Sequence, residues 1–500
     1  MTLLIDNSPV LIPLIFLATA LLIPVVAAKR KTLAWPLAFW ATIAVVAVSI
    51  FNVRRVICDG PVHYRLGNWA PPIGIEYVLD HLSAFVILVI NSVALLVLLH
   101  AKKVVARELP HKRVPYYAAV ILMLCGFNGI VITGDLFNLY VFLEISALSL
   151  YGLIAAGEKQ SPVAAFRYLI MGTIAASFYL LGVGFLYMET GSLNMADVKA
   201  ILPTVIDQPA ILVALVLMVL GMGIKMALFP MHGWLPDAYT YAPTTSSAII
   251  APTGTKVGAY VMLRVMFFVF GVNFVSKTLP LTQIISWLSA IAIIYGSVLA
   301  IAQKEMKRML AYSSVAQIGY IGLGIGLANP MALIGALFHV LNHAFMKACL
   351  FLVAGNFRYK LGHSNVSRLT DAVRKKMPWT MAAFTVAALS MVGLPPLSGF
   401  FSKLFLILGA YENSAWYFIV IIFISSLLNA VYFFRILEKV YMRPRIPVPG
   451  QEEETDVKRD EVSASMLLPT LILAAGLIIF GILNAFIVKG IINFMIPAGM

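Results

Sequence analysis

The sequence has little charge and almost no cysteine, and both shortages narrow the class of protein. Charged residues make up 12% of the 500 positions and hydrophobic residues 61%, which excludes an ordinary soluble domain. The cysteines, Cys58, Cys125 and Cys349, stand far apart, so they indicate neither a disulfide framework nor a metal site. There is also no cysteine cluster for iron–sulfur and no dinucleotide fingerprint. The sequence therefore predicts no cofactor.

Long apolar runs occupy most of the chain. A run of about 20 residues spans the hydrocarbon core as a helix, whereas barrel strands would be short and alternate in polarity. The sequence therefore predicts an all-α polytopic membrane protein, a single transmembrane domain over residues 1–500. About fourteen spans are expected, at 9–28, 33–53, 78–100, 115–133, 136–156, 163–188, 210–240, 245–271, 281–301, 309–328, 331–354, 378–412, 415–438 and 466–488.

The net charge of +14 is concentrated in alternate loops, such as those with Lys29–Lys31 and with Lys304, Lys307 and Arg308. By the positive-inside rule these loops are cytoplasmic. Together with an even number of spans, this predicts both termini on the outer face of the cytoplasmic membrane. The charge thus indicates topology in a lipid bilayer rather than binding to nucleic acid. Lys29–Lys31 follow the first run, the reverse of a signal peptide, so we expect that run to be a helix.

Two of the expected spans contain a break. The first runs from Gly221 through Lys225 and Pro230 to Asp237, and the second from Gly393 through Pro395–Pro396 to Lys403. Proline removes a backbone donor and clashes with the preceding turn, so each helix should be interrupted there. The breaks lie in spans seven and twelve, as expected if 115–271 and 281–438 are two inverted five-helix repeats. Residues 443–465, with several prolines and Glu452–Glu454, are expected to form a cytoplasmic linker.

Ionisable residues inside apolar spans carry the functional prediction. Insertion scales put their cost at roughly 2.5–3.5 kcal/mol at a helix centre, and function is the default reason for keeping them. Glu144, Lys225, Lys256 and Lys403 lie in four such spans. A buried lysine tends to lose its proton and a buried carboxylate to gain one, unless an opposite charge lies nearby. We predict that Glu144 and Lys225 form a separable pair that switches protonation, with Lys256 next and Lys403 as the terminal group.

The eleventh span adds His339, His343 and Lys347 at spacing i, i+4, i+8, which places all three on one helix face. Histidine titrates near neutrality and can pass protons, so we predict a relay. Two histidines four apart can also bind a metal, but no third ligand is nearby and a metal is not predicted. His232 and Asp237 lie in the first broken segment. For these two, moving protons and stabilising the exposed backbone both stay open.

Two further charged residues receive structural interpretations. Asp135 follows Gly134 at the start of the fifth span and is expected to cap that helix. Arg264 lies toward the outer end of the eighth span, and we expect its long side chain to extend to the membrane interface.

Three stretches of the sequence resemble the antiporter-like subunits found in Mrp-type cation/proton antiporters, respiratory complex I and membrane-bound hydrogenases. They are Gly134–Glu144, Lys225–Ala238 and His343–Lys347. The resemblance covers nearly the whole chain and implies fourteen helices, two inverted five-helix repeats and proton translocation along a polar axis at mid-membrane. It implies paired acid and base roles for Glu144 and Lys225 and a central lysine at Lys256. It also implies a second half-channel at His339, His343 and Lys347, and a family position at the second broken helix for Lys403.

Within this family, Gly393–Gly399 followed by Lys403 looks most like the D-type subunit of the Mrp antiporter. The expected function is therefore proton translocation in a multisubunit sodium/proton antiporter, with other membrane subunits as partners and no enzymatic chemistry in this chain. The first alternative is the proton-pumping, non-redox subunit of a redox complex of the NADH:quinone oxidoreductase, hydrogenase or formate hydrogenlyase type. A stand-alone carrier of a small organic solute and a purely structural subunit are the other two.

Overall fold

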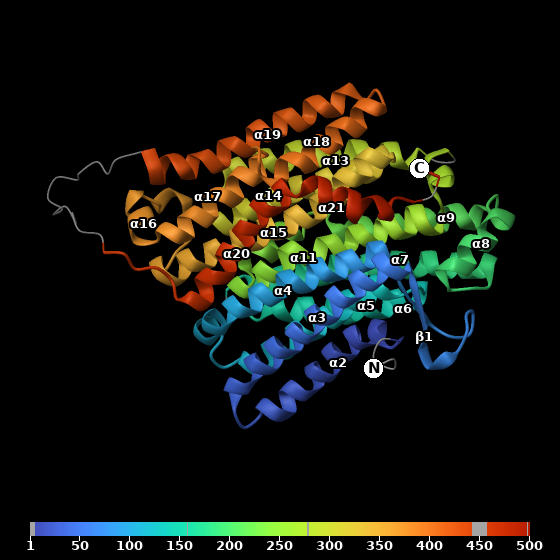
Figure 1. The fold of residues 1–500 in the computed structure, drawn as a ribbon, viewed down its shortest axis with the longest axis horizontal. Helices are drawn as coiled ribbons and strands as arrows, with labels where there is room; N and C mark the ends of the chain where they lie inside the picture. Colours follow the sequence, from blue (N-terminus) through green and yellow to red (C-terminus); the bar gives the residue numbers. More distant parts are fainter. Residues whose placement is uncertain (1–5, 158, 278–279, 443–457, 498) are drawn as a thin grey trace.

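The computed structural model describes residues 6–157, 159–277, 280–442, 458–497 and 499–500, and it shows a bundle of long helices packed side by side (Figure 1). The first half of the chain contains α2 (Ser8–Ala27), η1 (Lys31–Leu33), α3 (Ala34–Asp59), β1 (Val62–Arg65), η2 (Leu66–Asn68), β2 (Glu76–Leu79), α4 (His81–Glu108), α5 (Arg113–Ile132), α6 (Leu136–Ala155), α7 (Ser161–Thr190), α8 (Met195–Val205), α9 (Pro209–Met226), α10 (Leu235–Tyr241), α11 (Thr244–Leu263), the π-helical η3 (Arg264–Val269) and α12 (Val272–Lys277).

The second half contains α13 (Leu281–Ala302), α14 (Met306–Leu327), α15 (Pro330–Leu361), η4 (Val366–Arg368), α16 (Asp371–Lys376), α17 (Pro378–Val392), α18 (Ser398–Glu412), α19 (Trp416–Leu437), the π-helical η5 (Glu438–Met442), α20 (Ala464–Ile482), α21 (Asn484–Gly490) and η6 (Ile492–Met495). The start of α2 and the C-terminus lie at the same end of the bundle as β1 and α8, opposite α16 (Figure 1).

The all-α membrane class predicted from the sequence is confirmed. Within the described residues, 12 helices are long and apolar enough to cross a membrane. The two other expected spans correspond to α11, which is rich in Thr and Ser and carries Lys256, and to the pair α17 and α18, each 15 residues long. The count of fourteen and the inverted repeats stay predictions.

The two expected helix breaks are present. Helix α9 ends at Met226, and Ala227 (φ +62°) turns the chain before α10 begins at Leu235. Helix α17 ends at Val392, and Gly393 (φ +93°) precedes α18. A left-handed residue ends an α-helix and turns its last carbonyl groups away from helical partners. Each break therefore leaves backbone acceptors inside the bundle for side chains to bind.

A small antiparallel hairpin, β1 with β2, holds the start of α6. Its register pairs Val62 with Leu79 and Arg65 with Glu76. The Gly134 amide donates to the Glu76 carbonyl at 2.9 Å, and the Leu136 amide donates to the Leu193 carbonyl at 2.9 Å. These bonds fix the N-terminal turn of the helix that carries Glu144.

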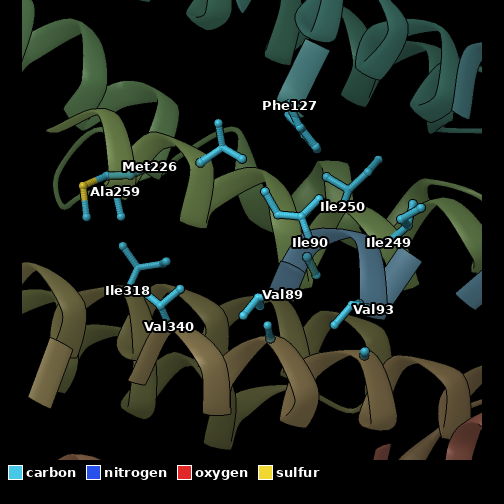
Figure 2. Close-up of a cluster of buried hydrophobic side chains, with 14 of the residues drawn as sticks. Val89, Ile90, Val93, Phe127, Met226, Ile249, Ile250, Ala259, Ile318 and Val340 are labelled. Carbon is cyan, nitrogen blue, oxygen red and sulfur yellow. The ribbon is translucent and has the colours of Figure 1, made fainter. Parts of the chain in front are cut away.

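The core lies where α4, α5, α9, α11, α14 and α15 meet. Figure 2 shows Val89, Phe127, Ile250, Ile318 and Val340 from five of these helices converging on one another. Of the 12 candidate spans, α14 and α15 are the most enclosed, with 94% and 100% of their most apolar 18-residue stretch buried, against 33% for α2. The predicted histidine stripe on α15 therefore lies inside the protein and away from lipid.

Most of the expected linker at 443–465 lies outside the described residues, which resume at 458. The described part contacts the rest of the chain. Asp460 forms ion pairs with Lys360 and with Lys376. Glu461 caps α17 by accepting from the Trp379 amide at 3.0 Å and from the Thr380 hydroxyl at 2.6 Å. This segment thus places α20 against α17 and α15.

Candidate functional site

Lys225 lies next to the first helix break and interacts electrostatically with Glu144. Lys225 lies in the last turn of α9, and Glu144 lies within electrostatic range on α6. Both side chains are partly buried, and among the described residues Glu144 Oε1 has no hydrogen-bond partner. The Trp234 indole closes the break by donating to the Ile224 carbonyl at 2.9 Å. The pair is thus held near a rigid turn without a direct bond between its two charges.

A small cavity adjoins Lys225. It has a volume of about 30 Å³ and is lined by Lys225, Ser146, Tyr168, Gly254, Gly258 and apolar side chains of α5, α6, α9 and α11. A water molecule needs roughly 10–15 Å³, so about two fit. Helices α9 and α11 come close here, since a Cβ on Gly258 would lie 3.0 Å from the Lys225 carbonyl carbon. The cavity connects the Lys225 end of α9 to the helix that carries Lys256.

Lys256 is the central cation of the buried set. Its side chain is 2% exposed, and its ammonium donates to the Ala251 carbonyl at 2.7 Å and contacts the Thr255 hydroxyl at 3.4 Å. His339, His343 and Lys347 of α15 lie within its electrostatic range. Lys256 therefore connects the first half of the bundle with the predicted stripe.

The stripe on α15 has the geometry expected from its spacing. His339, His343 and Lys347 are all fully buried, and the two imidazole rings stack with centroids 5.7 Å apart. His339 Nδ1 lies 3.0 Å from the Ser402 hydroxyl. Among the described residues, both ring nitrogens of His343 lack a hydrogen-bond partner. Two ring nitrogens of a side chain that can both accept and donate a proton are thus available for proton exchange.

Lys403 binds the backbone acceptors that the second break leaves free. Its ammonium donates to the Met391 carbonyl at 3.0 Å and to the Val392 carbonyl at 2.9 Å, at the end of α17. It also contacts the Ser426 hydroxyl at 3.1 Å and lies 5.1 Å from the centre of the Tyr320 ring. A cation at a helix C-terminus is stabilised by the helix dipole. His339 lies within electrostatic range of this ammonium.

The structure thus brings Lys256, His339, His343, Lys347 and Lys403 into one buried set and places Glu144 beside Lys225. It does not bring the two secondary candidates into this set. Asp237 forms ion pairs with Arg167 at 2.5 Å and with Arg308 at 3.6 Å, so of its two open interpretations the structure favours stabilising the broken segment. His232 is buried against aromatic rings, 5.4 Å from that of Phe229 and 5.2 Å from that of Tyr295.

The expectation for Arg264 is wrong, whereas the expectation for Asp135 is confirmed. Arg264 is 8% exposed and binds Asp80 instead of extending to the interface, because a nearby carboxylate offers better hydrogen bonding than the membrane surface. Asp135 caps α6 by accepting from the Asn138 amide at 2.6 Å. Burial raises the pKa of the Asp135 carboxyl.

Sequence reasoning missed three polar groups inside the bundle: Asp80, which is half-buried, and Lys307 and Gln317, which are buried. Asp80 pairs with a residue 184 positions away, a distance over which no local pattern operates. The charge pattern places Lys307 in a cytoplasmic loop, yet it is 3% exposed, and Gln317 is fully buried. Among the described residues, both amide atoms of Gln317 lack a partner. A polar residue in an otherwise apolar span was the available signal for Gln317.

The fold and this buried axis define a polytopic membrane protein of the antiporter-like class. Residues 133–429 match the family model described as NADH:quinone oxidoreductase/Mrp antiporter, TM. The match spans more than half of the chain, which therefore belongs to this family.

The family description names oxidoreductases and antiporters, and subunits of both kinds align with the chain. It is 47% identical over 464 residues to the N-type subunit of the NADH-quinone oxidoreductase of Desulforudis audaxviator, covering 91% of this chain and 92% of that protein. It is 30% identical over 476 residues to the D-type subunit of the Na⁺/H⁺ antiporter of Alkalihalophilus pseudofirmus, covering 95% and 92%. The expected family is confirmed, but the higher identity falls on the complex I type rather than on the expected antiporter type.

Solved structures give the same fold. A chain of the Mrp complex from Dietzia sp. superposes with a TM-score of 0.88 at 25% identity, covering 99% of this chain and 97% of that one. A chain of the membrane-bound sulfane sulfur reductase, an archaeal respiratory membrane complex, gives 0.87 at 30% identity, covering 98% of each. Both are subunits of large membrane assemblies.

Proposed function

We propose that this chain is a proton-translocating membrane subunit of a complex I-like redox complex. The observation that supports translocation is the buried axis from Glu144 and Lys225 through Lys256 to Lys403. The 47% identity to an N-type oxidoreductase subunit, against 30% to a D-type antiporter subunit, supports the choice of complex.

In the proposed cycle, each proton is handed along the axis without net gain or loss by the protein. While Glu144 lies near Lys225, its carboxylate favours the charged ammonium, and when the pair separates the lysine releases its proton. That proton passes through the adjoining cavity toward Lys256. Lys256 then delivers one proton to the His343 ring, His343 passes one to the His339 ring, and His339 passes one to Lys403, which releases one in turn. The pair closes again once Lys225 has taken up a new proton.

We further propose that the termini face outward and that the loops near α16 face the cytoplasm. The Lys and Arg residues of the loops at 29–31, 304–308 and 358–376 support this orientation. The start of α2 and the C-terminus lie at one end of the bundle, opposite α16 (Figure 1), which supports placing both on one side of the membrane. Electron transfer in the complex would reside in partner subunits, because this sequence contains no cysteine cluster or dinucleotide motif.

The second candidate is the proton-translocating D-type subunit of a sodium/proton antiporter. A TM-score of 0.88 to a chain of an Mrp complex and an alignment over 95% of this chain with a D-type antiporter subunit favour it. In that case Na⁺ exchange, and not electron transfer, would drive proton movement along the same axis.

Gentle purification of the native assembly, with identification of every co-purifying subunit by mass spectrometry, separates the two. Soluble subunits with iron–sulfur, flavin or nickel would support the redox complex, whereas only small membrane subunits and other antiporter-like chains would support the antiporter. Proton uptake into inverted membrane vesicles gives a functional readout: NADH drives it in the first case and an imposed Na⁺ gradient in the second. Transport by the isolated chain, unaffected by Lys256→Ala, would instead indicate a stand-alone carrier.

A further inference from the structure

A buried tyrosine that the sequence did not place in the predicted axis lies on α14. Tyr320 has no solvent-exposed surface and is among the largest fully buried side chains described. Its hydroxyl lies near Ser425 and Ser426 of α19, but it is within hydrogen-bond distance of no described residue. The ring, rather than the hydroxyl, therefore makes the close contacts at this position.

Two residues of the axis lie against the Tyr320 ring, and they come from different helices. The His339 ring of α15 has its centre 5.4 Å from that of Tyr320. The Lys403 ammonium of α18 lies over the ring, 5.1 Å from its centre. A cation over an aromatic face, within about 6 Å of the centre, is attracted by the negative face of the ring. Tyr320 thus contacts both side chains of the last transfer in the proposed cycle.

The packing of α14 against α15 fixes the place of the Tyr320 ring. Gly324, about one turn further along α14, approaches α15 very closely. A Cβ added to it would lie 2.6 Å from Ala336 Cβ and 2.7 Å from the Ala332 carbonyl oxygen. Because close-packed interiors resist shifts even of the size of a methyl group, the two helices have little freedom to slide. The ring is therefore held beside His339.

The other contacts of the Lys403 ammonium supply hydrogen-bond acceptors but no negative charge. They are the Met391 and Val392 carbonyls and the Ser426 hydroxyl, which together use the three N–H donors of an ammonium. Within the described part of the chain, the ion pairs do not include Lys403. The face of the Tyr320 ring therefore adds to the dipole of α17 in stabilising this positive charge.

Few titratable groups face Lys403 from the helices packed closely against α18, which are α14, α15, α17, α19 and α20. Helix α15 contributes His339 and α14 contributes Tyr320, whereas α17 and α20 contain no titratable side chain. The titratable groups of α19 have partners elsewhere: Tyr417 stacks on Trp287, Tyr432 donates to Asn429 and Arg435 donates to the Ile301 carbonyl. On α18 itself, Tyr411 and Glu412 lie at its far end. A change in the Tyr320 ring thus acts on Lys403 and His339 directly.

We infer that Tyr320 is a positioning residue for the transfer of a proton from His339 to Lys403. This inference rests on the proposed proton translocation. In the transfer, the His339 imidazolium loses a proton and the neutral Lys403 amine gains it, so one N–H bond breaks and another forms. No bond to Tyr320 changes. Its ring attracts the ammonium and not the neutral amine, so it favours the arrival of the proton at Lys403.

Replacement of the ring separates this role from simple filling of space. Tyr320→Phe keeps the aromatic face and removes a hydroxyl that no described residue binds, so we expect proton transport close to the wild-type rate. Tyr320→Leu keeps an apolar side chain but removes the aromatic face. We expect this variant to lower transport roughly tenfold or more at pH 8. The alkaline limb of its pH profile should move about one unit lower, as the loss of a desolvated cation–π contact predicts.

The measurement follows initial rates of proton uptake between pH 6 and pH 9, with the native complex in proteoliposomes that contain a pH dye. The driving force is NADH or an imposed Na⁺ gradient, whichever the wild-type complex uses. Phe384→Leu is the matched control, because Phe384 is a fully buried ring of α17 that packs on the Phe433 ring. It loses the same kind of packing, and its pH profile should keep the wild-type alkaline limb.

A Tyr320→Leu profile with the wild-type alkaline limb would overturn the inference, whatever the rate of this variant. An equal shift in Phe384→Leu, or a Tyr320→Phe complex impaired as much as Tyr320→Leu, would also overturn it. A wild-type complex that moves no protons would instead overturn the proposed function.

Should Tyr320→Leu fail to assemble, a ring of nearly the same shape provides the test. Tyr320→Phe is then compared with Tyr320→3,4,5-trifluorophenylalanine, introduced by suppression of a stop codon. Fluorine withdraws electron density from the ring and so weakens its negative face. A lower alkaline limb in the fluorinated complex supports the inference, and equal pH profiles for the two complexes overturn it.

Discussion

The Arg264 guanidinium holds the Asp80 carboxylate with two hydrogen bonds, of 2.5 and 2.9 Å. Asp80 caps the N-terminus of α4, and Arg264 follows the last turn of α11. Arg264 also binds the Tyr260 hydroxyl, which in turn donates to the Val131 carbonyl at 2.7 Å. This ion pair therefore joins three helices at the end of the bundle opposite Lys307.

Asp80→Asn is expected to destabilise the protein by about 3 kcal/mol, because breaking a buried pair leaves an uncompensated charge. The fall would be measured as a lower midpoint of thermal unfolding in detergent. Asp460→Asn removes a carboxylate from an exposed pair and should leave that midpoint unchanged. Equal midpoints for Asp80→Asn and the wild type would contradict a stabilising role.

The same pair should be insensitive to pH over the working range. Burial by itself raises the pKa of the Asp80 carboxyl, but the Arg264 guanidinium outweighs it and lowers the pKa to about 2. Since the folded pKa lies below the unfolded value of about 3.9, the contribution is fully present above about pH 4 and is lost as pH falls through 2. The difference in unfolding midpoint between wild type and Asp80→Asn should thus be constant from pH 5 to pH 9. A marked decline in this difference within that window would rule out the assigned pairing.

Lys225→Ala is expected to abolish proton transport without preventing membrane insertion. Removing the ammonium leaves Glu144 without its partner, while a less charged helix inserts more easily. The variant complex would be purified and its subunit content verified, and its rate of proton uptake would be compared with that of the wild type. We expect this rate to fall about tenfold or more. Lys199→Ala, at an exposed lysine of α8, serves as the control. Wild-type rates in a fully assembled Lys225→Ala complex would remove Lys225 from the mechanism.

Gly393→Ala should disturb both the second break and Lys403. The glycine has φ +93°, and an added Cβ would lie 3.1 Å from Lys403 Cδ and 3.3 Å from its Nζ. We expect a loss of about 1 kcal/mol or more from the strained backbone and a reduced rate of proton transport. Gly184→Ala, where a Cβ would meet nothing within 4 Å, should be neutral or slightly stabilising. If Gly393→Ala and Gly184→Ala have the same stability and the same rate of proton transport, the positive φ at Gly393 does not require glycine.

Much of the candidate site could be predicted because its signals are local. Helical spacing placed His339, His343 and Lys347 on one face, and their rings and burial agree with it. Proline and glycine residues predicted both helix breaks. The free-energy cost of burying a charge identified Lys225, Lys256 and Lys403 as candidate site residues. In contrast, the ion pairs of Asp237 with Arg167 and of Arg264 with Asp80 join residues far apart along the chain.

By itself, the sequence determined the membrane class, the helix breaks and the set of buried ionisable groups, because apolar length, backbone chemistry and helical periodicity act over a few residues. Only the tertiary structure decided which of these groups lie together: Lys256 beside the α15 stripe, Lys403 on the carbonyls of α17, and Lys307 buried against Ala242 rather than exposed in a loop. Such contacts depend on how separate helices pack and rotate against one another, and no local pattern of residues records that.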